Sequence, residues 1–470
     1  MPGKVAISDG VRGIDYSTFA FWIWHAREFL MRQGVRSGGI AVLELDSLID
    51  CWVFGFALRS LGCTTISVNS LNWLNTLSLR DIGCIVTDAS MGPPEDGSYR
   101  EAFKFIRVPR KSYLDMVAED IPHPPVIAST AGGHILLTSG TTGTRKKILI
   151  GDRHLAPLLK RFALVYGLSE RSVVCVFDFL NFTGAGYKVP ISVWNLGGTV
   201  LICQATGRHN ALRADGITGV LFTPRLLFEI LNAPGREIPK NERIHAYIAG
   251  GPLTRELAAE TKAKLTPQLF TAIASTEMGL WTMTRIERDE DLYSHRIHPS
   301  AEVQIVDEAD QKLPPGRTGA IRIRTPDMSS RYLDDDTASC ASFRGGYFYS
   351  GDLGMFEADG RLVLQGRSNN VLNVLGQKIS AEVIERGIQE ELAVDGVCVI
   401  SQEGGGMDPR FHIVIETRRA IGERELASAF GSWFPGIPQI SAHFVDRLPR
   451  GDMGKIDRAV LRRHLNSLKG

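Results

Sequence analysis

A loop rich in glycine and hydroxyl side chains occupies residues 138–146, which read Thr-Ser-Gly-Thr-Thr-Gly-Thr-Arg-Lys. The two glycines let successive backbone N–H groups face one concavity, the hydroxyls add donors, and Lys146 adds a positive charge. These features predict a cradle for a polyphosphate. The loop is not a Walker A motif, because the GxxxxGK[ST] spacing is absent and the residues after it predict a strand instead of a helix. Taken alone, the segment could also be an ordinary Ser/Thr/Gly-rich hairpin.

Five further motifs follow this loop along the chain. They are Gly250-Gly-Pro-Leu253, Ser275-Thr-Glu-Met-Gly279, Tyr349-Ser-Gly-Asp-Leu-Gly354, the segment Gly366–Ile379, and Leu448–Arg458. In this order they resemble the motifs of the acyl-adenylate-forming superfamily, which includes acyl-CoA synthetases, adenylation domains of nonribosomal peptide synthetases, and beetle luciferases. The region before the loop fits as well, so the resemblance spans nearly the whole chain.

The resemblance implies a reaction in two steps. A carboxylate attacks the α-phosphorus of ATP to give an acyl-adenylate and pyrophosphate, and a thiol then takes the acyl group. The thiol belongs to CoA or to the phosphopantetheine of a carrier protein. In the first step, two like charges about 4 Å apart repel by roughly 4 kcal/mol at an effective dielectric near 20. Mg²⁺ and lysine charges held in place before reaction must offset that repulsion.

Individual roles follow from the positions that match the family's motifs. Glu277 would hold Mg²⁺, Thr276 would donate to the α-phosphate, and Lys455 would be the mobile lysine that reaches the substrate carboxylate. Asp352 would accept from the ribose hydroxyls, and Arg367 would support the same sugar. The residues expected to bind the nucleotide are Thr138, Ser139, Gly140, Thr141, Thr142, Gly143, Lys146, Gly250, Gly251, Ser275, Asp352 and Arg367.

The acid pocket is less well defined by the sequence. Candidate lining residues are Asn181, Phe182, Gly184, Met278 and Gly279, of which Asn181 stands where acyl-CoA synthetases often carry a histidine. Asp178 follows a phenylalanine, as does the aspartate that holds the ammonium group in amino-acid adenylation domains. A buried or capping aspartate is the more economical interpretation. Fatty, aryl and amino acids therefore all remain open.

Two departures from the family pattern affect the nucleotide site. Arg145, Lys146 and Lys147 stand where Pro-Lys-Gly is usual, which predicts more positive charge at the exit of the loop. Ile273 and Ala274 replace a Tyr-Gly pair, and loss of an aromatic face beside adenine costs on the order of 1 kcal/mol. We therefore expect a modest affinity for ATP.

Hydrophobic periodicity predicts the elements that position these motifs. Residues 17–34 have helical spacing from Ser17, an N-cap type, to Gly34. A strand at 40–45, a helix at 47–61 and a strand at 64–68 predict a βαβ unit and hence a parallel sheet. From 301 to 364, short alternating segments separated by Pro, Gly and Asp predict antiparallel structure.

The fold class expected is α/β with two domains. Residues 1–366 form a large N-terminal domain of βαβ-type sheets with a small, antiparallel, β-barrel-like subdomain, and bind AMP and the acyl group. Residues 367–470 form a small, mobile α+β C-terminal lid. The resemblance places the hinge at Asn369, and Gly376 on the side that approaches the thiol nucleophile.

Composition sets limits on the function. The 470 residues carry 53 Lys+Arg and 52 Asp+Glu, a formal net charge of +1, which argues against a nucleic-acid-binding surface. Seven scattered cysteines without a CxxC pair fit neither a zinc site nor a disulfide framework, so they are expected to be reduced and mostly buried. We expect a cytoplasmic protein with no membrane span and no signal peptide.

The sequence therefore predicts an AMP-forming acid–thiol ligase, most simply a carboxylic acid:CoA ligase. One alternative is an acyl-AMP ligase or stand-alone adenylation enzyme that loads a carrier-protein phosphopantetheine. A second is a nucleotide-binding homologue with impaired catalysis, suggested by the altered residues of the loop and the adenine position. Retention of Glu277, Asp352, Arg367 and Lys455 argues against that second alternative.

Overall fold

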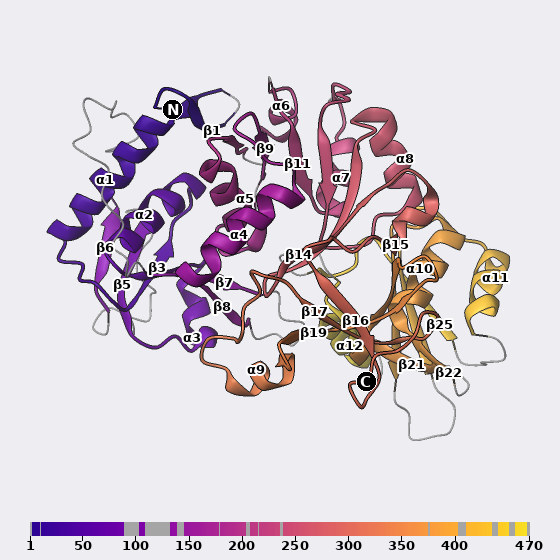
Figure 1. Ribbon diagram of the computed structural model, residues 1–470. Coiled ribbons are helices and arrows are strands. Elements are labelled where there is room, and N and C mark those ends of the chain that lie inside the picture. The colour runs from indigo at the N-terminus through magenta and orange to yellow at the C-terminus, as the bar shows by residue number, and fades with distance from the viewer. Residues whose placement is uncertain are drawn as a thin grey trace.

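Two largely parallel β-sheets form most of the N-terminal part of the protein (Figure 1). The computed structural model describes residues 2–9, 11–88, 103–108, 132–138, 145–177, 179–203, 207–214, 216–235, 238–374, 377–402, 410–434, 440–450 and 456–467. The first sheet has the order β6-β5-β3-β4-β7-β8 and is parallel except for the β7–β8 pair. Its strands are β3 (Ile40–Glu44), β4 (Thr64–Ser67), β5 (Ile82–Asp88), β6 (Phe105–Val108), β7 (His134–Leu137) and β8 (Lys147–Ile150).

The second sheet has the order β14-β13-β12-β11-β9-β10-β1-β2. Its six central strands are parallel, and the antiparallel strands β14 and β2 form its two edges. Its strands are β1 (Val5–Ser8), β2 (Gly13–Asp15), β9 (Val173–Cys175), β10 (Thr199–Leu201), β11 (Gly219–Phe222), β12 (His245–Ile248), β13 (Leu269–Ser275) and β14 (Gly279–Arg285).

Helices cover both faces of these sheets. One buried cluster joins side chains of both sheets with those of α1 (Tyr16–Arg32), α2 (Leu48–Ser60), α4 (Asp152–Val165) and α5 (Gly184–Asn195). Successive side chains of a strand point to opposite faces of the sheet, and this explains the layers. In β3, Ala41 and Leu43 belong to this cluster, whereas Val42 belongs to a second cluster on the other face. The remaining helical elements of this part are η1 (Leu71–Trp73), α3 (Leu74–Leu77), α6 (Arg208–Ala211), α7 (Pro224–Leu231), α8 (Arg255–Lys264) and η3 (Asp289–Leu292).

The predicted βαβ unit is confirmed, since β3 and β4 are parallel and flank α2. Ser47 caps α2 by accepting from the backbone of Asp50 at 3.2 Å. The prediction that Ser17 caps the first helix is wrong. Asp15 is the N-cap, and its carboxylate accepts from Thr18 N at 2.7 Å. The Asp15 carboxylate satisfies the free amide of Thr18, and its negative charge interacts favourably with the positive end of the helix dipole.

A third, antiparallel sheet follows, as predicted from the alternating segments. Its order is β15-β20-β19-β17-β16, with β18 paired to β19. Strands β15 and β16, at the two ends of this order, are not paired with each other in the described structure. The elements are β15 (Ser294–His295), β16 (Glu302–Val306), β17 (Gly319–Arg324), α9 (Asp336–Ser342), β18 (Phe343–Arg344), β19 (Tyr347–Phe356) and β20 (Leu362–Arg367).

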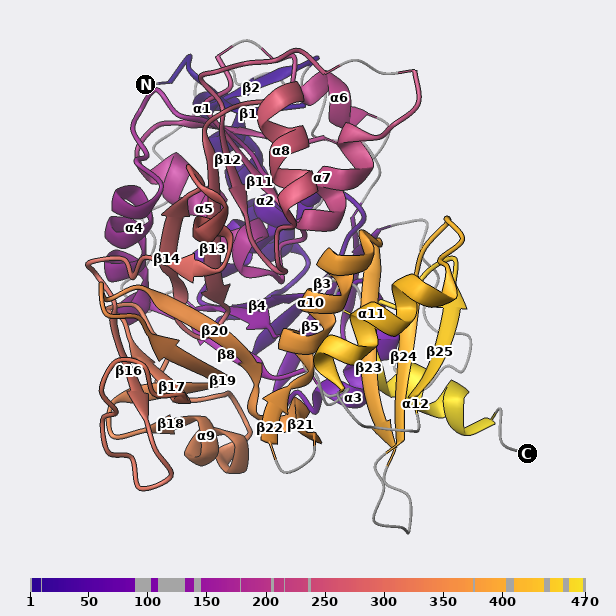
Figure 2. The same cartoon turned by 90° about the vertical axis from the view of Figure 1, so that its right-hand side faces the viewer.

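The C-terminal residues build their own small layers of helix and sheet (Figure 2). Two buried clusters there draw their members from residues 372–465. The elements are η4 (Ser368–Asn370), β21 (Val371–Val374), β22 (Gln377–Ser380), α10 (Ala381–Leu392), β23 (Gly396–Gln402), β24 (Arg410–Glu416), α11 (Glu423–Trp433), β25 (Ile440–Val445) and α12 (Arg458–Ser467).

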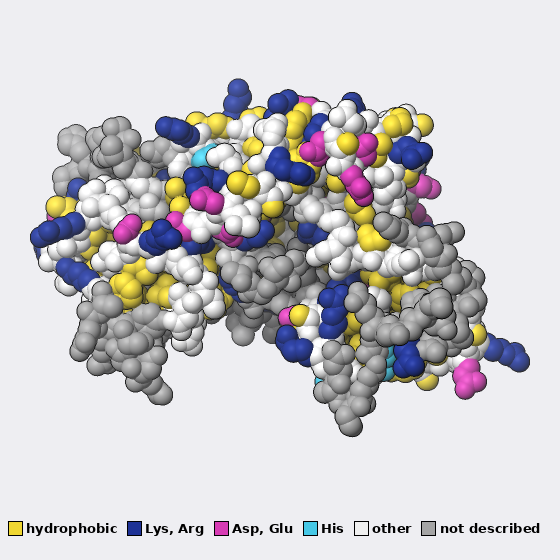
Figure 3. All heavy atoms as spheres, turned by 90° about the horizontal axis from the view of Figure 1, so that it is seen from below, with side chains coloured by type: hydrophobic (Ala, Val, Ile, Leu, Met, Phe, Trp, Pro, Cys, Tyr) yellow, Lys and Arg dark blue, Asp and Glu magenta, His cyan; other side chains and the backbone are white. Residues whose placement is uncertain are grey.

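The surface and the cysteines agree with the composition. All seven cysteines are free thiols, and six of them are buried, Cys340 being exposed. On the face shown in Figure 3, Lys and Arg side chains are spread over the surface and do not form one basic stripe. Among the described residues, no helix has the length and apolar character that crossing a membrane requires.

Candidate active site

The base of the glycine-rich loop is closed by two hydrogen bonds between Thr138 and Lys146. Thr138 N donates to Lys146 O at 2.9 Å, and Lys146 N donates to Thr138 Oγ1 at 3.3 Å. These residues follow β7 and precede β8, which pair antiparallel, as the flanking apolar runs predicted. The loop residues 139–144 lie outside the described residues, so the predicted ligands Ser139, Gly140, Thr141, Thr142 and Gly143 stay predictions.

The three basic residues at the exit of the loop have different partners. The Arg145 guanidinium lies 4.1 Å from the ring centroid of Trp73, and the Lys146 ammonium lies 4.6 Å from that of Tyr332. Lys147 is 5% exposed, and its ammonium donates to Leu77 O at 2.6 Å. The expectation of three charges at the loop exit therefore fails for Lys147, because its ammonium is buried against the carbonyls that end α3.

Three further predicted nucleotide residues lie at the carboxyl ends of two neighbouring parallel strands. Gly250 and Gly251 follow β12, and Ser275 ends β13, the next strand of the sheet. Gly250 has φ +90°, a conformation that glycine adopts without strain. Carboxyl ends of adjacent parallel strands share one edge of a sheet, which is where ligands of open α/β sheets bind.

The turn between β13 and β14 carries Thr276 and Glu277. Glu277 is 8% exposed, and Tyr332 Oη donates to its Oε1 at 2.8 Å. Burial, and then the Glu277 charge, raise the pKa of Tyr332, so the phenol stays protonated and remains a donor. The described residues contain no group of three or more His, Cys, Asp or Glu that could hold a metal. A lone glutamate fits Mg²⁺ that is bound mainly through nucleotide phosphates.

Residues 325–332, the cradle segment, hold this turn from one side. Ser329 N donates to Glu277 O at 2.8 Å, and Thr325 Oγ1 donates to Met278 O at 3.1 Å. Together with the Tyr332 hydroxyl, these bonds hold the Glu277 carbonyl and the Glu277 carboxylate. The turn is therefore positioned by a distant segment of the chain, since Tyr332 and Glu277 are 55 residues apart.

Two buried cations also hold the turn. Arg161 of α4 forms a bidentate ion pair with Asp327, with N–O distances of 2.5 and 3.0 Å, and also donates to Met278 O at 2.6 Å. Lys188 of α5 is 1% exposed and donates to Thr276 O at 2.9 Å. Sequence patterns did not identify Arg161, Lys188, Asp327 or Tyr332. The one available signal was a charged residue within an otherwise apolar helix, as at Lys188.

Asp352 and Arg367 face each other on neighbouring antiparallel strands. Their Cα atoms are partners in the β19–β20 register, and Arg367 Nε lies 3.0 Å from Asp352 Oδ1. Arg367 also donates to Ser350 O at 2.8 Å. Asp352 thus lies within strand β19. A carboxylate oriented by a cross-strand arginine is suited to accept from two sugar hydroxyls.

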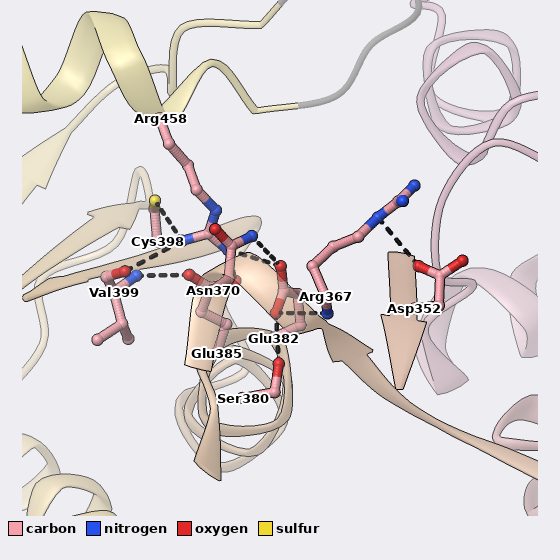
Figure 4. A network of polar contacts seen from close by, with 9 residues as sticks. All are labelled: Asp352, Arg367, Asn370, Ser380, Glu382, Glu385, Cys398, Val399 and Arg458. Atoms are coloured by element: carbon pink, nitrogen blue, oxygen red, sulfur yellow. Dashed lines mark hydrogen bonds and ion pairs between the residues drawn. The ribbon is translucent and has the colours of Figure 1, made fainter. Parts of the chain in front are cut away.

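The predicted hinge is adjacent to a polar network drawn in Figure 4. The Glu382 carboxylate accepts from Asn370 Nδ2 at 2.5 Å and from Arg367 N at 3.4 Å. Arg458 reaches both Glu382 at 3.5 Å and the buried Glu385 at 2.6 Å. The network therefore links the chain around Asn369 to the start of α12. The predicted catalytic Lys455 and the thiolation-side Gly376 lie outside the described residues.

The predicted acid-pocket residues surround the start of α5 and the turn. Asn181 and Phe182 run beside β7, since His134 Nε2 lies 2.9 Å from Asn181 O and Leu137 N donates to Phe182 O at 2.9 Å. Phe182 packs into a core cluster against Trp73. Met278 is fully buried, Gly184 begins α5, and Gly279 (φ +71°) begins β14. Asp178 lies outside the described residues.

The chain was compared with known proteins. Residues 97–333, half of the chain, match the AMP-binding enzyme family. Enterobactin synthase component E of Escherichia coli (strain K12) is 24% identical over 99% of this chain and 92% of its own length. A salicylyl-CoA synthase / salicylate adenylyltransferase of a Streptomyces species is 26% identical over 70% of this chain and 62% of its own.

Among solved structures, ATP-bound MatB from Rhodopseudomonas palustris superposes with a TM-score of 0.84 at 19% identity, covering 100% of this chain and 97% of that one. This likeness extends the α/β fold of the family over the whole chain, the C-terminal layers included. The ordered motifs, the turn that carries Glu277 and the family match agree with one another. The protein belongs to the AMP-binding enzyme family and is an acyl-adenylate-forming, AMP-forming acid–thiol ligase of the acyl-CoA synthetase type.

Proposed function

We propose that the protein activates an aromatic carboxylic acid with MgATP and transfers the acyl group to CoA. One observation carries the proposal. Tyr332 brings together the two charges that the first step needs, because its hydroxyl binds Glu277 and its ring face lies against the Lys146 ammonium. A carboxylate for Mg²⁺ and a cation for phosphate thus lie on either side of one side chain.

We assign a role to each residue from its position in the family's motifs and in the structure. Glu277 would hold the Mg²⁺, which neutralises phosphate charge when bound, and Thr276 beside it would donate to the α-phosphate. Lys146 would leave the Tyr332 ring for the phosphates, and Asp352 would accept from the ribose. Lys455 would bring the final positive charge to the reacting carboxylate as the C-terminal domain closes. These assignments rest on the family's motifs and on the geometry of the described residues.

An aromatic acid with a hydroxyl next to its carboxyl group is the substrate class that we favour. The names of two relatives specify such acids, salicylate and 2,3-dihydroxybenzoate. Asn181 is 3% exposed and its Nδ2 donates to Ser67 Oγ at 3.2 Å, whereas its Oδ1 has no hydrogen-bond partner among the described residues. A buried acceptor without a partner costs free energy, and an ortho-hydroxyl group would satisfy it.

Acid-dependent ATP–pyrophosphate exchange tests the substrate class. Salicylate should support exchange at least about tenfold better in kcat/KM than benzoate, because a site built for a hydroxyl rejects the analogue without one. Octanoate and phenylalanine represent the fatty and amino acids. Asn181→Leu should reduce the preference for salicylate over benzoate, and Ser192→Ala, within α5, should leave it unchanged. Faster exchange with octanoate or phenylalanine would exclude the aromatic class.

The thiol acceptor is tested separately. Incubation with ATP, the best acid and free CoA should yield acyl-CoA detectable by mass spectrometry. Exchange activity without any acyl-CoA would favour a carrier-protein phosphopantetheine as acceptor. Failure of exchange with every acid would favour a homologue with impaired catalysis.

The same proposal includes two domains, 1–366 and 367–470, joined at a hinge near Asn369. The support for this division is that two buried hydrophobic clusters consist only of described residues numbered 372 or higher. Among the described residues, contacts between the two parts include polar ones, such as that of Tyr293 Oη with Glu390. Polar interfaces of this kind permit relative motion of domains.

A further inference from the structure

We infer that Lys188 is a positioning residue for adenylate formation, which it serves by holding the peptide between Thr276 and Glu277. The inference rests on the proposed function, because it concerns the two residues that would contact the α-phosphate and Mg²⁺. Lys188 is outside the motifs identified in this sequence, and it lies one turn inside α5, among apolar neighbours.

The position of Lys188 is costly for a charged side chain. It is 1% exposed, and within the described residues its ammonium donates one hydrogen bond, at 2.9 Å to Thr276 O. An ammonium group has three donors, and burial without full pairing is unfavourable. Burial also lowers the pKa of Lys188 to about 8, although the nearby carboxylates of Asp327 and Glu277 oppose this shift. Overall stability therefore does not explain a lysine here.

The hydrogen bond has a specific geometric consequence. A trans peptide is planar, so fixing the carbonyl of Thr276 also fixes the opposite direction of the Glu277 N–H. The same plane contains the Cα atoms of both residues, from which their side chains extend. Lys188 therefore orients the peptide from which the Thr276 and Glu277 side chains extend, and Tyr332 holds the Glu277 carboxylate itself.

Other groups already fix the rest of the turn. Ser329 N binds Glu277 O, and Arg161 binds the carbonyls of Met278 and Leu280. Arg161 is itself neutralised by its bidentate pair with Asp327. Lys188 holds the remaining carbonyl at the start of the turn, next to the reacting groups. Its removal should leave the turn folded and the Thr276–Glu277 peptide free to rotate.

Lys188→Met separates the positioning role from a structural one. Methionine has a similar length and no charge to desolvate, so the variant should have a melting temperature equal to or above that of the wild type. Loss of a group that orients a metal ligand typically lowers activity by about 10- to 100-fold. We expect that loss in kcat of ATP–pyrophosphate exchange, with KM for the acid changed less than about twofold.

The matched control is Ser192→Ala. Ser192 lies one turn further along α5, is fully buried, and donates to a backbone carbonyl, that of Lys188, at 2.7 Å. It does not contact the turn in the described structure. Its exchange kinetics should equal those of the wild type. If Lys188→Met and Ser192→Ala have the same exchange rate, the inference is wrong.

A double-mutant cycle with Glu277→Gln gives a second readout. If Lys188 acts through the Thr276–Glu277 peptide, Lys188→Met should lower the residual exchange of Glu277→Gln by less than about threefold. If Lys188 contributed only to structure, it would act independently of Glu277. The fold-losses of exchange in the two single variants would then multiply in the double variant. Multiplied losses, or a loss of activity that parallels a lower melting temperature, would overturn the positioning role.

The design also separates this inference from the proposed function. If the wild type shows no exchange with any acid, the proposed function fails, and the rise in melting temperature on adding MgATP becomes the readout. A smaller rise in Lys188→Met than in the wild type would support the inference. An equal rise, or none in either protein, would overturn it.

Discussion

At the scale of single residues, Tyr332 joins the two charged groups nearest to the proposed chemistry. Tyr332→Phe removes the hydroxyl that binds Glu277 at 2.8 Å and keeps the ring beneath Lys146. A hydrogen bond to a charged group contributes about 1.5–3 kcal/mol, so we expect exchange to fall by about 10- to 100-fold and to require more Mg²⁺. The measurement is the exchange rate as a function of Mg²⁺ concentration.

The control for this prediction is Tyr347→Phe. Its hydroxyl also binds a glutamate, Glu302, but on the antiparallel sheet. That variant should keep the wild-type exchange rate and Mg²⁺ dependence. An unchanged Mg²⁺ dependence in Tyr332→Phe would show that the hydroxyl does not orient Glu277.

His134 connects stability to pH. It is 1% exposed, contacts Thr65 Oγ1 at 2.8 Å, and burial lowers its pKa from 6.5 to about 3. Below pH 6.5 the unfolded chain binds a proton at this residue and the folded chain does not. Stability from the neutral imidazole is therefore present above pH 6.5 and is lost as the pH falls toward 3, by about 1.4 kcal/mol per pH unit.

His134→Gln, which does not titrate, should lack this contribution to the pH dependence. The free energy of unfolding in urea, measured at pH 7.5, 5.5 and 4.5, should fall less steeply for the variant than for the wild type. Parallel pH dependences for the two proteins would contradict the prediction.

At the scale of elements, the turn between β13 and β14 depends on a glycine at its exit. Gly279 has φ +71°, and a Cβ there would lie 2.5 Å from Arg161 Nη2 and 3.2 Å from Phe162. Gly279→Ala therefore adds a clash to the cost of the left-handed conformation, which is roughly 1–2 kcal/mol. We expect a larger loss of unfolding free energy than conformation alone would cause, together with slower exchange.

Gly167→Ala is the matched control, because Gly167 has a similar φ of +59° and open space around its Cα. Its loss of stability should be about 1 kcal/mol, without an effect on exchange. Urea unfolding of both variants measures the difference. Equal losses would mean that Arg161 moves aside without cost.

Elements were predicted well where local pattern determines them. The parallel β3–α2–β4 unit and the antiparallel strands from 302 to 367 follow from periodicity and turn residues. The first helix was predicted with the wrong cap, because Ser17 and Asp15 are both good N-caps and the choice depends on β2, which ends at Asp15. Pairing of distant strands decides such boundaries.

At the scale of the whole molecule, we expect the C-terminal domain to rotate about the hinge near Asn369 between the two half-reactions. Proline fixes φ and restricts the residue before it, so Asn369→Pro should hinder the change of backbone dihedrals at η4. We expect slower transfer of the acyl group from a supplied acyl-adenylate to CoA, and near-normal ATP–pyrophosphate exchange. Rapid-quench assays of the two half-reactions measure this.

Lys455→Ala is the reciprocal variant. Loss of one charge partner of the transition state should lower adenylate formation by about two to three orders of magnitude. Acyl transfer from a supplied acyl-adenylate should stay close to normal. If both variants slow both half-reactions equally, separate roles for the hinge and the lysine are excluded.

The sequence by itself indicated the class of reaction, through motifs that resemble those of the family, and predicted the β3–α2–β4 unit and the antiparallel strands from 302 to 367, because motif residues and strand periodicity are local along the chain. Tertiary structure alone decided which groups hold the motifs in place. Lys188 and Thr276 are 88 residues apart, and Arg161 and Asp327 are 166 apart. It also turned Lys147 away from the loop. No local pattern encodes such contacts, because they form only when the helices and the cradle segment pack against the sheet edge.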